Sequence, residues 1–314
     1  MKILITGVHG FVGSNLVKAL SQEYTIYGVD IIAPEKEGVV KTYSWDDLDT
    51  GCIVDVDAIV HLAGKAHETK NQSVYNVYFE VNTELTKKIY DYFLASEAKK
   101  FVFFSSVKAA ADKVEGEFID ENVMPLPKGP YGESKMAAEK YMMAKEDERI
   151  KSGKEAYILR PCMIHGPGNK GNLNLLYNMV KKGVPWPLGA FENQRTFTSI
   201  DNVSFIVNGL LTKDVASGVY NINDDEAVST NELIEIICGV TGHRPCIWRI
   251  PQCLMKCVAR IGGMLCLPLN TERLGKLTEN YVSSNQKIKS ALGVGRLPVR
   301  AVDGLVKTIK SFEK

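Results

Sequence analysis

The sequence carries almost no excess charge, has no long apolar run and contains few cysteines. Its 38 basic and 37 acidic residues give a net charge of +1, so no general attraction to nucleic acid or to a membrane is expected. No uninterrupted apolar run is long enough to cross a bilayer, and we expect no membrane insertion. The apolar run Ile3–Ile5 is short and is soon interrupted by Gly7 and His9, which argues against a signal peptide.

The seven cysteines are an odd number and include no Cys-x-x-Cys pair. This usage is typical of a reduced, cytoplasmic protein rather than of a disulfide scaffold. Cys253 and Cys257 lie one helical turn apart, but their neighbours are apolar and only His243 is near them in sequence. We therefore predict buried thiols there, and we expect no metal site.

What the sequence does contain is a strong pattern in its first twenty residues. The run Ile3–Ile5 predicts a buried strand, and the apolar spacing of Phe11–Leu20 predicts a helix directly after a tight turn. Three glycines, each three residues from the next, let the backbone turn sharply and approach a pyrophosphate, which N–H groups at the helix start would bind. The predicted cofactor contacts in this segment are Gly7, Gly10, Phe11, Val12 and Gly13.

An acidic residue at the end of the next strand supports a dinucleotide site over an ordinary glycine-rich turn. The apolar segment Thr25–Val29 ends at Asp30, twenty residues after Gly10, where this type of fold holds the adenosine ribose hydroxyls. A carboxylate there disfavours a ribose 2′-phosphate, and Ile31 and Ile32 follow instead of an arginine. We therefore predict NAD rather than NADP, with Asp30 and Ile31 beside the ribose.

Further apolar strands alternate with helical patterns along the chain. Short apolar runs at 57–61, 101–104, 156–161 and 218–222 predict strands, and residues 74–94 predict a long helix, whereas residues 31–50 are polar and irregular. Ser229 and Glu232 predict an N-cap and capping box before a helix. The fold class predicted is α/β: a Rossmann-type doubly wound parallel sheet with a smaller, discontinuous C-terminal substrate-binding cap.

The same pattern predicts the domain boundaries. Residues 1–165, with about 193–217, would form the NAD-binding domain, and residues 166–192 and 218–314 would form the cap. The strongly apolar segment 253–269 is interrupted by Lys256 and Arg260, so a core or subunit interface is predicted rather than membrane contact.

The most informative chemical pattern is Tyr131 followed by Lys135, because a helix places residues four apart on one face. A phenol ionises near pH ~10, which is too high for a base at neutral pH. An adjacent ammonium favours the phenolate and makes proton transfer feasible. Ser106, at the end of the strand before this helix, can orient a substrate oxygen. The pattern Tyr-x-x-x-Lys is common by itself. Because it follows the glycine pattern, Asp30 and Ser106 in the chain, it indicates a catalytic pair here.

Taken together, these motifs resemble the extended short-chain dehydrogenase/reductases of the NAD-dependent epimerase/dehydratase family, in particular UDP-galactose 4-epimerases and bacterial nucleotide-sugar C4 reductases. The resemblance implies a catalytic set of Ser106, Tyr131 and Lys135. It also implies further cofactor contacts at Leu62, Ala63, Gly64, Asn82, Ser105 and Pro161, besides Tyr131 and Lys135 themselves.

The same resemblance implies residues that bind the substrate. The segment 166–168 and Asn172 resemble a loop that holds the nucleotide, and Arg195 resembles the arginine that binds the diphosphate, a role suited to a guanidinium. A structural ion-pair role for Arg195, or for Arg160, remains an alternative. The implied substrate contacts are Lys65, Ser106, Lys108, Asn172, Arg195 and Arg273.

Two departures from the family pattern narrow the reaction. Ala110 and Ala111 stand where many members have a Tyr-Gly pair, and 106–108 (Ser-Val-Lys) resembles a subgroup associated with bacterial surface-sugar synthesis. The 4,6-dehydratases have Thr-Asp-Glu at this site, because elimination of water needs an acid and a base. Since Ser-Val-Lys supplies no carboxylate pair, dehydratase activity is not expected.

The function these features predict is a 4-epimerase of a UDP-hexose that works with NAD by transient oxidation at C4. The same residues would serve a reductase of a UDP-4-keto-6-deoxy-hexose in surface polysaccharide synthesis, so that alternative stays open. A non-catalytic dinucleotide-binding sensor is a more distant one. The expected partner is a nucleotide sugar, with no nucleic acid, and the expected assembly is a homodimer in the cytoplasm.

Overall fold

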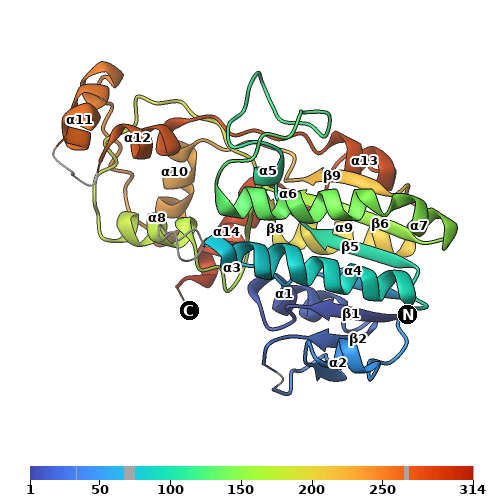
Figure 1. Cartoon of the computed structure of the whole chain (residues 1–314). Coiled ribbons are helices and arrows are strands. Elements are labelled where there is room, and N and C mark those ends of the chain that lie inside the picture. The colour runs from blue at the N-terminus through green and yellow to red at the C-terminus, as the bar shows by residue number, and fades with distance from the viewer. Residues whose placement is uncertain (33, 67–74, 265–268, 314) are drawn as a thin grey trace.

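The computed structural model describes residues 1–32, 34–66, 75–264 and 269–313 (Figure 1). The expected helix start at Val74 and part of the apolar segment 253–269 lie outside the described residues.

Seven strands form one parallel sheet in the order β3-β2-β1-β4-β5-β6-β9. The strands are β1 (Lys2–Thr6), β2 (Thr25–Val29), β3 (Lys41–Tyr43), β4 (Ala58–His61), β5 (Lys100–Phe104), β6 (Glu155–Pro161) and β9 (Gly218–Ile222). The chain runs outward from β1 to β3 and then returns to place β4 on the other side of β1. The switch point between β1 and β4 is where open α/β sheets bind ligands, beyond the carboxyl ends of the strands.

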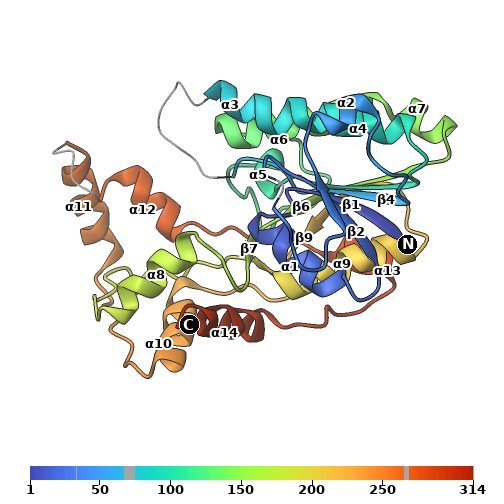
Figure 2. The same cartoon turned by 90° about the horizontal axis from the view of Figure 1, so that it is seen from below.

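Helices cover both faces of this sheet, so its strands are buried and nearly continuously apolar (Figure 2). On one face lie α4 (Leu85–Ala95) and α6 (Gly129–Ala144), and on the other lie α1 (Phe11–Leu20), α9 (Ile200–Thr212) and α13 (Gln286–Leu292). Three short helices complete this part: α2 (Asp47–Thr50), α5 (Val107–Ala110) and α7 (Glu146–Lys151). The predicted doubly wound Rossmann-type sheet is confirmed.

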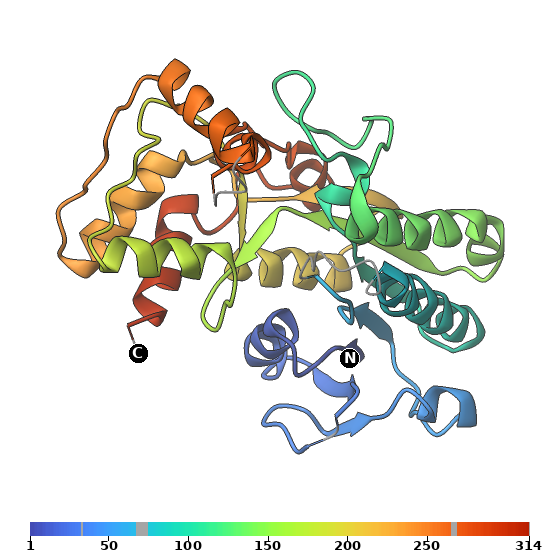
Figure 3. The same cartoon turned by 60° about the vertical axis from the view of Figure 1, so that its left-hand side comes forward.

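A second group of helices, which we call the cap, lies beyond one end of the sheet and has its own apolar core (Figure 3). The cap helices are α8 (Asn172–Lys181), α10 (Thr230–Thr241), α11 (Gln252–Met264), α12 (Thr271–Thr278) and α14 (Ala301–Ser311). Ser229 and Glu232 form the predicted capping box at the start of α10. Two short parallel strands, β7 (Met163–His165) and β8 (Phe197–Ser199), lie where the chain passes between the sheet and the cap.

Three expectations need correction. Strand β9, which the predicted boundaries assign to the cap, pairs with β6 and extends the main sheet, and α13 packs beside it. Residues 31–50 are not wholly irregular, because β3 pairs with β2 and α2 follows it. Cys253 and Cys257 are exposed rather than buried, since α11 uses its other side to pack on the cap.

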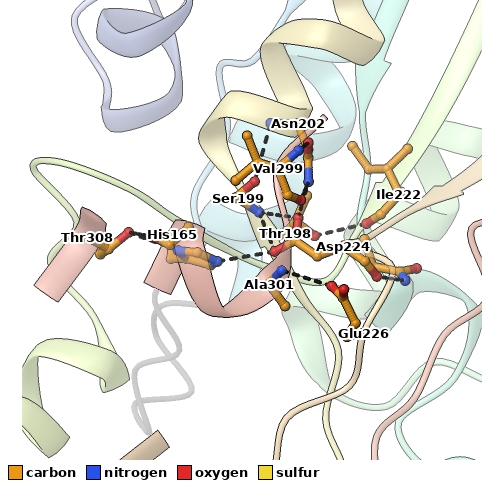
Figure 4. Close-up of polar contacts among 12 residues, drawn as sticks. His165, Thr198, Ser199, Asn202, Ile222, Asp224, Glu226, Val299, Ala301 and Thr308 are labelled. Carbon is orange, nitrogen blue, oxygen red and sulfur yellow. Dashed lines mark hydrogen bonds and ion pairs between the residues drawn. The ribbon is translucent and has the colours of Figure 1, made fainter. Parts of the chain in front are cut away.

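A buried polar network joins the part of the molecule built around the seven-stranded sheet, which we call the sheet half, to α14 of the cap (Figure 4). The Asp224 carboxylate follows β9 and accepts hydrogen bonds from the Ser199 backbone N–H (2.9 Å) and the Asn202 side chain (2.7 Å). His165 places Nε2 3.4 Å from Asp224 and Nδ1 2.9 Å from the Thr308 hydroxyl of α14. Asp224 and His165 are fully buried, so these bonds satisfy groups that would otherwise be costly to bury.

Candidate active site

The glycine turn after β1 is tightly packed against the chain that follows β4. Gly7 has φ +69°, and a Cβ added there would lie 2.9 Å from the backbone N of Ala63. A Cβ on Gly13 would collide with the carbonyl oxygen of Gly7, so α1 packs closer to the turn than a side chain allows. Gly10 is the N-cap of α1, and it provides no side-chain hydrogen bond to the helix start. The first N–H groups of α1 therefore lie ready for an anion at the switch point.

Asp30 ends β2 beside this turn, as the sequence predicts. Its carboxylate accepts the backbone N–H of His9 at 2.9 Å and that of Ile31 at 2.8 Å. These bonds fix the carboxylate next to the glycine turn, while its remaining lone pairs can accept ribose hydroxyls. A phosphoryl group in the same place would meet a like charge. The turn and the carboxylate therefore fit NAD.

Asn82 and Lys135 lie together beyond the end of β4. An added Cβ on Gly64 would be 2.9 Å from Asn82 Oδ1 and 3.0 Å from Lys135 Nζ, which places all three residues at one point. The Asn82 side chain accepts the Lys65 N–H at 2.8 Å and donates to Ser134 Oγ at 3.0 Å. It lies in a π-helical turn, η2 (Glu80–Glu84), that joins α3 (Tyr75–Phe79) to α4. Such turns interrupt the regular helix and often occur at functional sites.

Lys135 is buried on α6 and reaches back to the end of β5. Its Nζ donates to the Phe104 carbonyl at 2.8 Å and lies 4.9 Å from the centre of the Phe103 ring. Burial lowers the pKa of Lys135 to about 8, and the negative charge of Glu139 opposes that change. The ammonium is therefore held in place, and its pKa of about 8 lies below the usual range for lysine.

Tyr131 lies in the first turn of α6, where Pro130 is well suited to a helix start. Gly132 lets this turn approach α5: an added Cβ would be 2.5 Å from the Lys108 carbonyl oxygen. Ser106 is the N-cap of α5, and its Oγ accepts the Lys108 N–H at 3.2 Å. The contact between α5 and α6 brings the Ser106 segment to the turn that carries Tyr131.

Beneath these groups lies an ion pair of Arg160, whose partner the sequence analysis did not name. Arg160 of β6 binds the Glu139 carboxylate through two nitrogens, with Nη2 to Oε2 at 2.6 Å. The Ser105 hydroxyl donates to the same carboxylate, and Glu139 is fully buried. This confirms the structural alternative for Arg160, and it assigns Ser105 a support role beside its predicted cofactor contact. A Tyr-x-x-x-Lys helix with an acid four residues on, and an arginine in the next strand, was the available signal.

The predicted substrate residues divide into two groups. Lys65 and Lys108 lie near the sheet: Lys65 Nζ is 5.4 Å from the centre of the Tyr78 ring, and Lys108 Nζ pairs with Asp112 at 3.1 Å. Lys108 Nζ also lies 4.5 Å from the centre of the Tyr281 ring. Both ammonium groups therefore have fixed surroundings at the carboxyl end of the sheet.

The other predicted substrate residues belong to the cap side. Asn172 is the first, exposed residue of α8, and Arg273 lies exposed on α12. The Arg195 guanidinium donates to the Lys276 carbonyl of α12, and its Nε is buried without a hydrogen-bond partner. Burial lowers the pKa of Arg195, and Glu279 opposes the effect. A partly desolvated guanidinium with an unused N–H is well suited to a diphosphate oxygen.

The loop at 166–168 joins the cap to the glycine turn. Asn15 of α1 donates to the Pro167 carbonyl at 3.1 Å, and an added Cβ on Gly166 would be 3.6 Å from the Phe11 ring. The loop expected to hold a nucleotide thus packs directly on the first turn of α1. Phe11 has a structural contact here besides its predicted place at the cofactor.

No group of three or more His, Cys, Asp or Glu side chains in the described part of the chain could hold a metal ion. No helix among residues 1–32, 34–66, 75–264 and 269–313 is both long and apolar enough to cross a membrane.

A glycine turn at a switch point, an acid at the end of β2 and a Tyr–Lys helix define a dinucleotide-binding enzyme of the extended short-chain dehydrogenase/reductase type. The chain belongs to the NAD dependent epimerase/dehydratase family, whose model matches residues 3–223, and its cofactor is NAD. The family resemblance expected from the motifs is confirmed.

Several known proteins that are similar to this chain are named as sugar 4-epimerases. It is 31% identical to the UDP-glucose 4-epimerase of Vibrio cholerae over 266 residues, which cover 79% of this chain and 78% of the relative. It is 27% identical, over 74% of this chain and 70% of the relative, to the N-acetyl-alpha-D-glucosaminyl-diphospho-ditrans,octacis-undecaprenol 4-epimerase of Escherichia coli O157:H7. The structure of MoeE5 in complex with UDP-glucuronic acid and NAD superposes with a TM-score of 0.78 at 22% identity, covering 100% of this chain and 99% of that one. That likeness shows the fold.

Proposed function

We propose that the protein is a 4-epimerase of a UDP-linked hexose that oxidises C4 transiently. The observation that carries the proposal is the packing of α6 on α5, which brings the Tyr131 turn to Ser106 above the buried Lys135. The similarity to a UDP-glucose 4-epimerase over most of both chains supports it.

Each residue of this set has a defined task in the proposal. NAD, when bound, would supply the acceptor and donor of the C4 hydride. Tyr131 accepts the proton of the 4-hydroxyl, and Ser106 donates a hydrogen bond to the reacting oxygen. Lys135, whose ammonium is fixed by the Phe104 carbonyl, stabilises the Tyr131 phenolate by its positive charge.

The cap would bind the substrate away from the reacting carbon. Arg195, Arg273 and Asn172 would hold the nucleotide diphosphate, and the exposed positions of Asn172 and Arg273 leave them accessible to it. An anchor at the diphosphate leaves the sugar able to turn over between the two hydride transfers, which an epimerase requires. Lys65 and Lys108 would contact the sugar side. Residues 166–192 and 223–284, with α14, are the proposed substrate-binding part.

The absence of an acid beside Ser106 argues against dehydration. Val107 and Lys108 occupy the two following positions, and the Lys108 ammonium pairs with Asp112. The site therefore has a base, Tyr131, but no acidic side chain directly after Ser106 that could protonate a departing hydroxyl group.

The experiment is a nucleotide-sugar panel. Purified protein is incubated with UDP-glucose, UDP-galactose and their N-acetyl forms, with no added cofactor, and the sugars are separated. Formation of a C4 epimer supports the proposal. No epimer from any of them, together with stoichiometric oxidation of NADH or NADPH on a UDP-4-keto-6-deoxy sugar, transfers the assignment to the reductase. Because one relative is named for a polyprenyl-diphosphate sugar, such a substrate forms a further arm of the panel.

The cellular location and the oligomeric state of the protein are also proposals. The six described cysteines are all unpaired, which supports the reducing cytoplasm as the place of action. A homodimer is expected, and light scattering on the purified protein tests it.

A further inference from the structure

Helix α11 has two apolar sides, and only one of them packs against the cap. Met255, Ala259 and Gly262 are buried toward the cap core. On the other side Leu254 is 53% exposed, Val258 44% and Ile261 51%. These three recur at intervals of four and three residues, so they form one continuous stripe. Of the predicted core or subunit-interface role of this segment, the core role therefore holds for the cap side of the helix and not for this exposed side.

The surroundings of this stripe are basic. Residues 236–271 contain no Asp or Glu, whereas they contain four basic residues, Arg244, Arg249, Lys256 and Arg260. All four are exposed, and Lys256 and Arg260 lie on α11 itself. Trp248, in the segment before the helix, is 54% exposed. A chain with a net charge of +1 thus concentrates positive charge and exposed apolar area at one helix.

The position of α11 leaves the stripe accessible. It lies at the far end of the cap from the sheet, and its neighbour is α12 (Figures 1 and 2). An exposed apolar stripe, a lysine and an arginine on the polar side of the same helix and an exposed tryptophan in the segment before it are the pattern of a helix that lies in the interface of a membrane.

We propose that α11 docks the protein on the surface of an anionic lipid bilayer. Leu254, Val258 and Ile261 would enter the boundary between headgroups and acyl chains. Lys256 and Arg260 would lie beside lipid phosphates, to which their charge is complementary. The contact is peripheral and reversible, because one short amphipathic stripe does not anchor a protein as a spanning helix does.

Charge decides between a lipid surface and a second copy of this chain. In a two-fold symmetric contact the segment 236–271 of one copy, with four basic residues and no acidic one, would approach the same segment of the other copy. Glu272, the first acidic residue after this segment, lies within 3.1 Å of Lys276 on α12. A symmetric contact at α11 would therefore bring like charges together, whereas an anionic bilayer neutralises them.

Docking would also orient the substrate side. Helix α12, the neighbour of α11, carries Arg273 and provides the carbonyl that binds the Arg195 guanidinium. The proposed diphosphate site therefore includes residues of the helix next to the one that meets the bilayer. The docking proposal itself stands without the proposed reaction.

The test uses the full chain and sedimentation with lipid vesicles. Vesicles of phosphatidylcholine alone are compared with vesicles that also contain phosphatidylglycerol. We expect binding to the anionic vesicles, with weaker binding at high salt, and little binding to phosphatidylcholine alone. Failure to bind anionic vesicles overturns the proposal.

Three variants locate the contact. Leu254→Ser/Val258→Ser/Ile261→Ser and Lys256→Glu/Arg260→Glu should each lower the bound fraction at least fivefold. The control Met124→Ser/Leu126→Ser/Ile150→Ser changes three apolar residues elsewhere that are more exposed than those of the stripe, and it should bind like the parent. Since all changed residues are exposed, unchanged circular dichroism and NAD binding confirm the fold. Equal loss in the control would overturn a specific role for α11.

A second readout follows Trp248 directly. Its fluorescence should shift to the blue on anionic vesicles, and Trp248→Phe should abolish the shift while vesicles are still bound. A concentration-dependent dimer, seen by light scattering and lost only in the α11 triple variant, would instead assign this side of the helix to a second copy and overturn the proposal.

Discussion

The sheet half and the cap handle their functional side chains in opposite ways. Lys135, Asn82 and Glu139 of the sheet half are buried, and each is held by hydrogen bonds or an ion pair. In the cap, Asn172 and Arg273 are exposed. Under the proposed function, the groups near the reaction are fixed in advance, whereas two of the three proposed diphosphate contacts stay accessible and only Arg195 is partly buried and held by a hydrogen bond. This is expected when chemistry needs exact geometry and binding must admit a large ligand.

The sharpest test of this comparison is Tyr131→Phe. The ring keeps its place in α6 but the proton acceptor is gone, so turnover should fall by about 10²–10⁴-fold. Binding of the nucleotide sugar should remain nearly normal, because the cap residues are unchanged. Steady-state kinetics and calorimetric binding measure the two quantities, and near-normal turnover would mean that another group is the base.

Glu139→Gln tests the buried support beneath the site. It leaves the Arg160 guanidinium buried without its countercharge, which should lower the free energy of unfolding by about 3–5 kcal/mol. It also removes the charge that raises the pKa of Lys135, so that pKa should drop below about 8.

The pH profile separates these two effects. Lys135 must be protonated to stabilise a phenolate, so kcat should fall as the pH rises through about 8, and in Glu139→Gln the fall should begin at lower pH. Glu139→Leu/Arg160→Met removes both charges and should regain stability without restoring the pH profile. An unchanged profile would show that Glu139 is only structural.

Arg195→Ala tests the cap side. Losing a charged hydrogen bond to the diphosphate should raise the KM of the nucleotide sugar by roughly tenfold to a hundredfold. NAD affinity should not change, since Arg195 lies on the cap side of β8, away from the glycine turn. If NAD binding weakened equally, Arg195 would be a structural residue. The cap would then lack its main recognition group, and the comparison between the sheet half and the cap would fail.

Asp30→Asn should have the smallest effect. The amide oxygen can still accept one of the two backbone N–H groups, those of His9 and Ile31, which now bind separate carboxylate oxygens, but the charge that repels a 2′-phosphate is lost. The preference for NAD over NADP should shrink roughly tenfold, in line with the loss of one charge interaction. Titration of both cofactors measures it, and tighter NADP binding by the unchanged protein would contradict the role of Asp30.

Local patterns predicted the parts of the fold whose causes are local. The turn with Gly7 and Gly13 needs small residues for close approach, and Asp30 ends its strand, so both could be read from spacing. The strand β9 was recognised but assigned to the wrong half, because pairing with β6 is a tertiary choice. The short strand β3 has only three residues and no apolar pattern of its own.

The polar contacts of the site could not be read from spacing. Arg160 and Glu139 are 21 residues apart, and His165 and Asp224 are 59 apart, so only the folded chain brings them together. Exposure on α11 was equally hidden, because its apolar residues surround most of the helix and the sequence does not say which side packs.

The π-helical turn that holds Asn82 has a consequence for how this enzyme can be engineered. Leu85 donates to the Glu80 carbonyl five residues back, so the turn amounts to one residue more than a regular helix would use. Deleting one exposed residue of that turn, such as Glu80 or Glu84, would give a straighter and more heat-resistant helix, while rotating Asn82 by about a quarter turn away from Lys135. Thermal midpoint and NAD affinity should then move in opposite directions. Thermostabilisation schemes that favour regular helices would thus select against the predicted cofactor contact of Asn82.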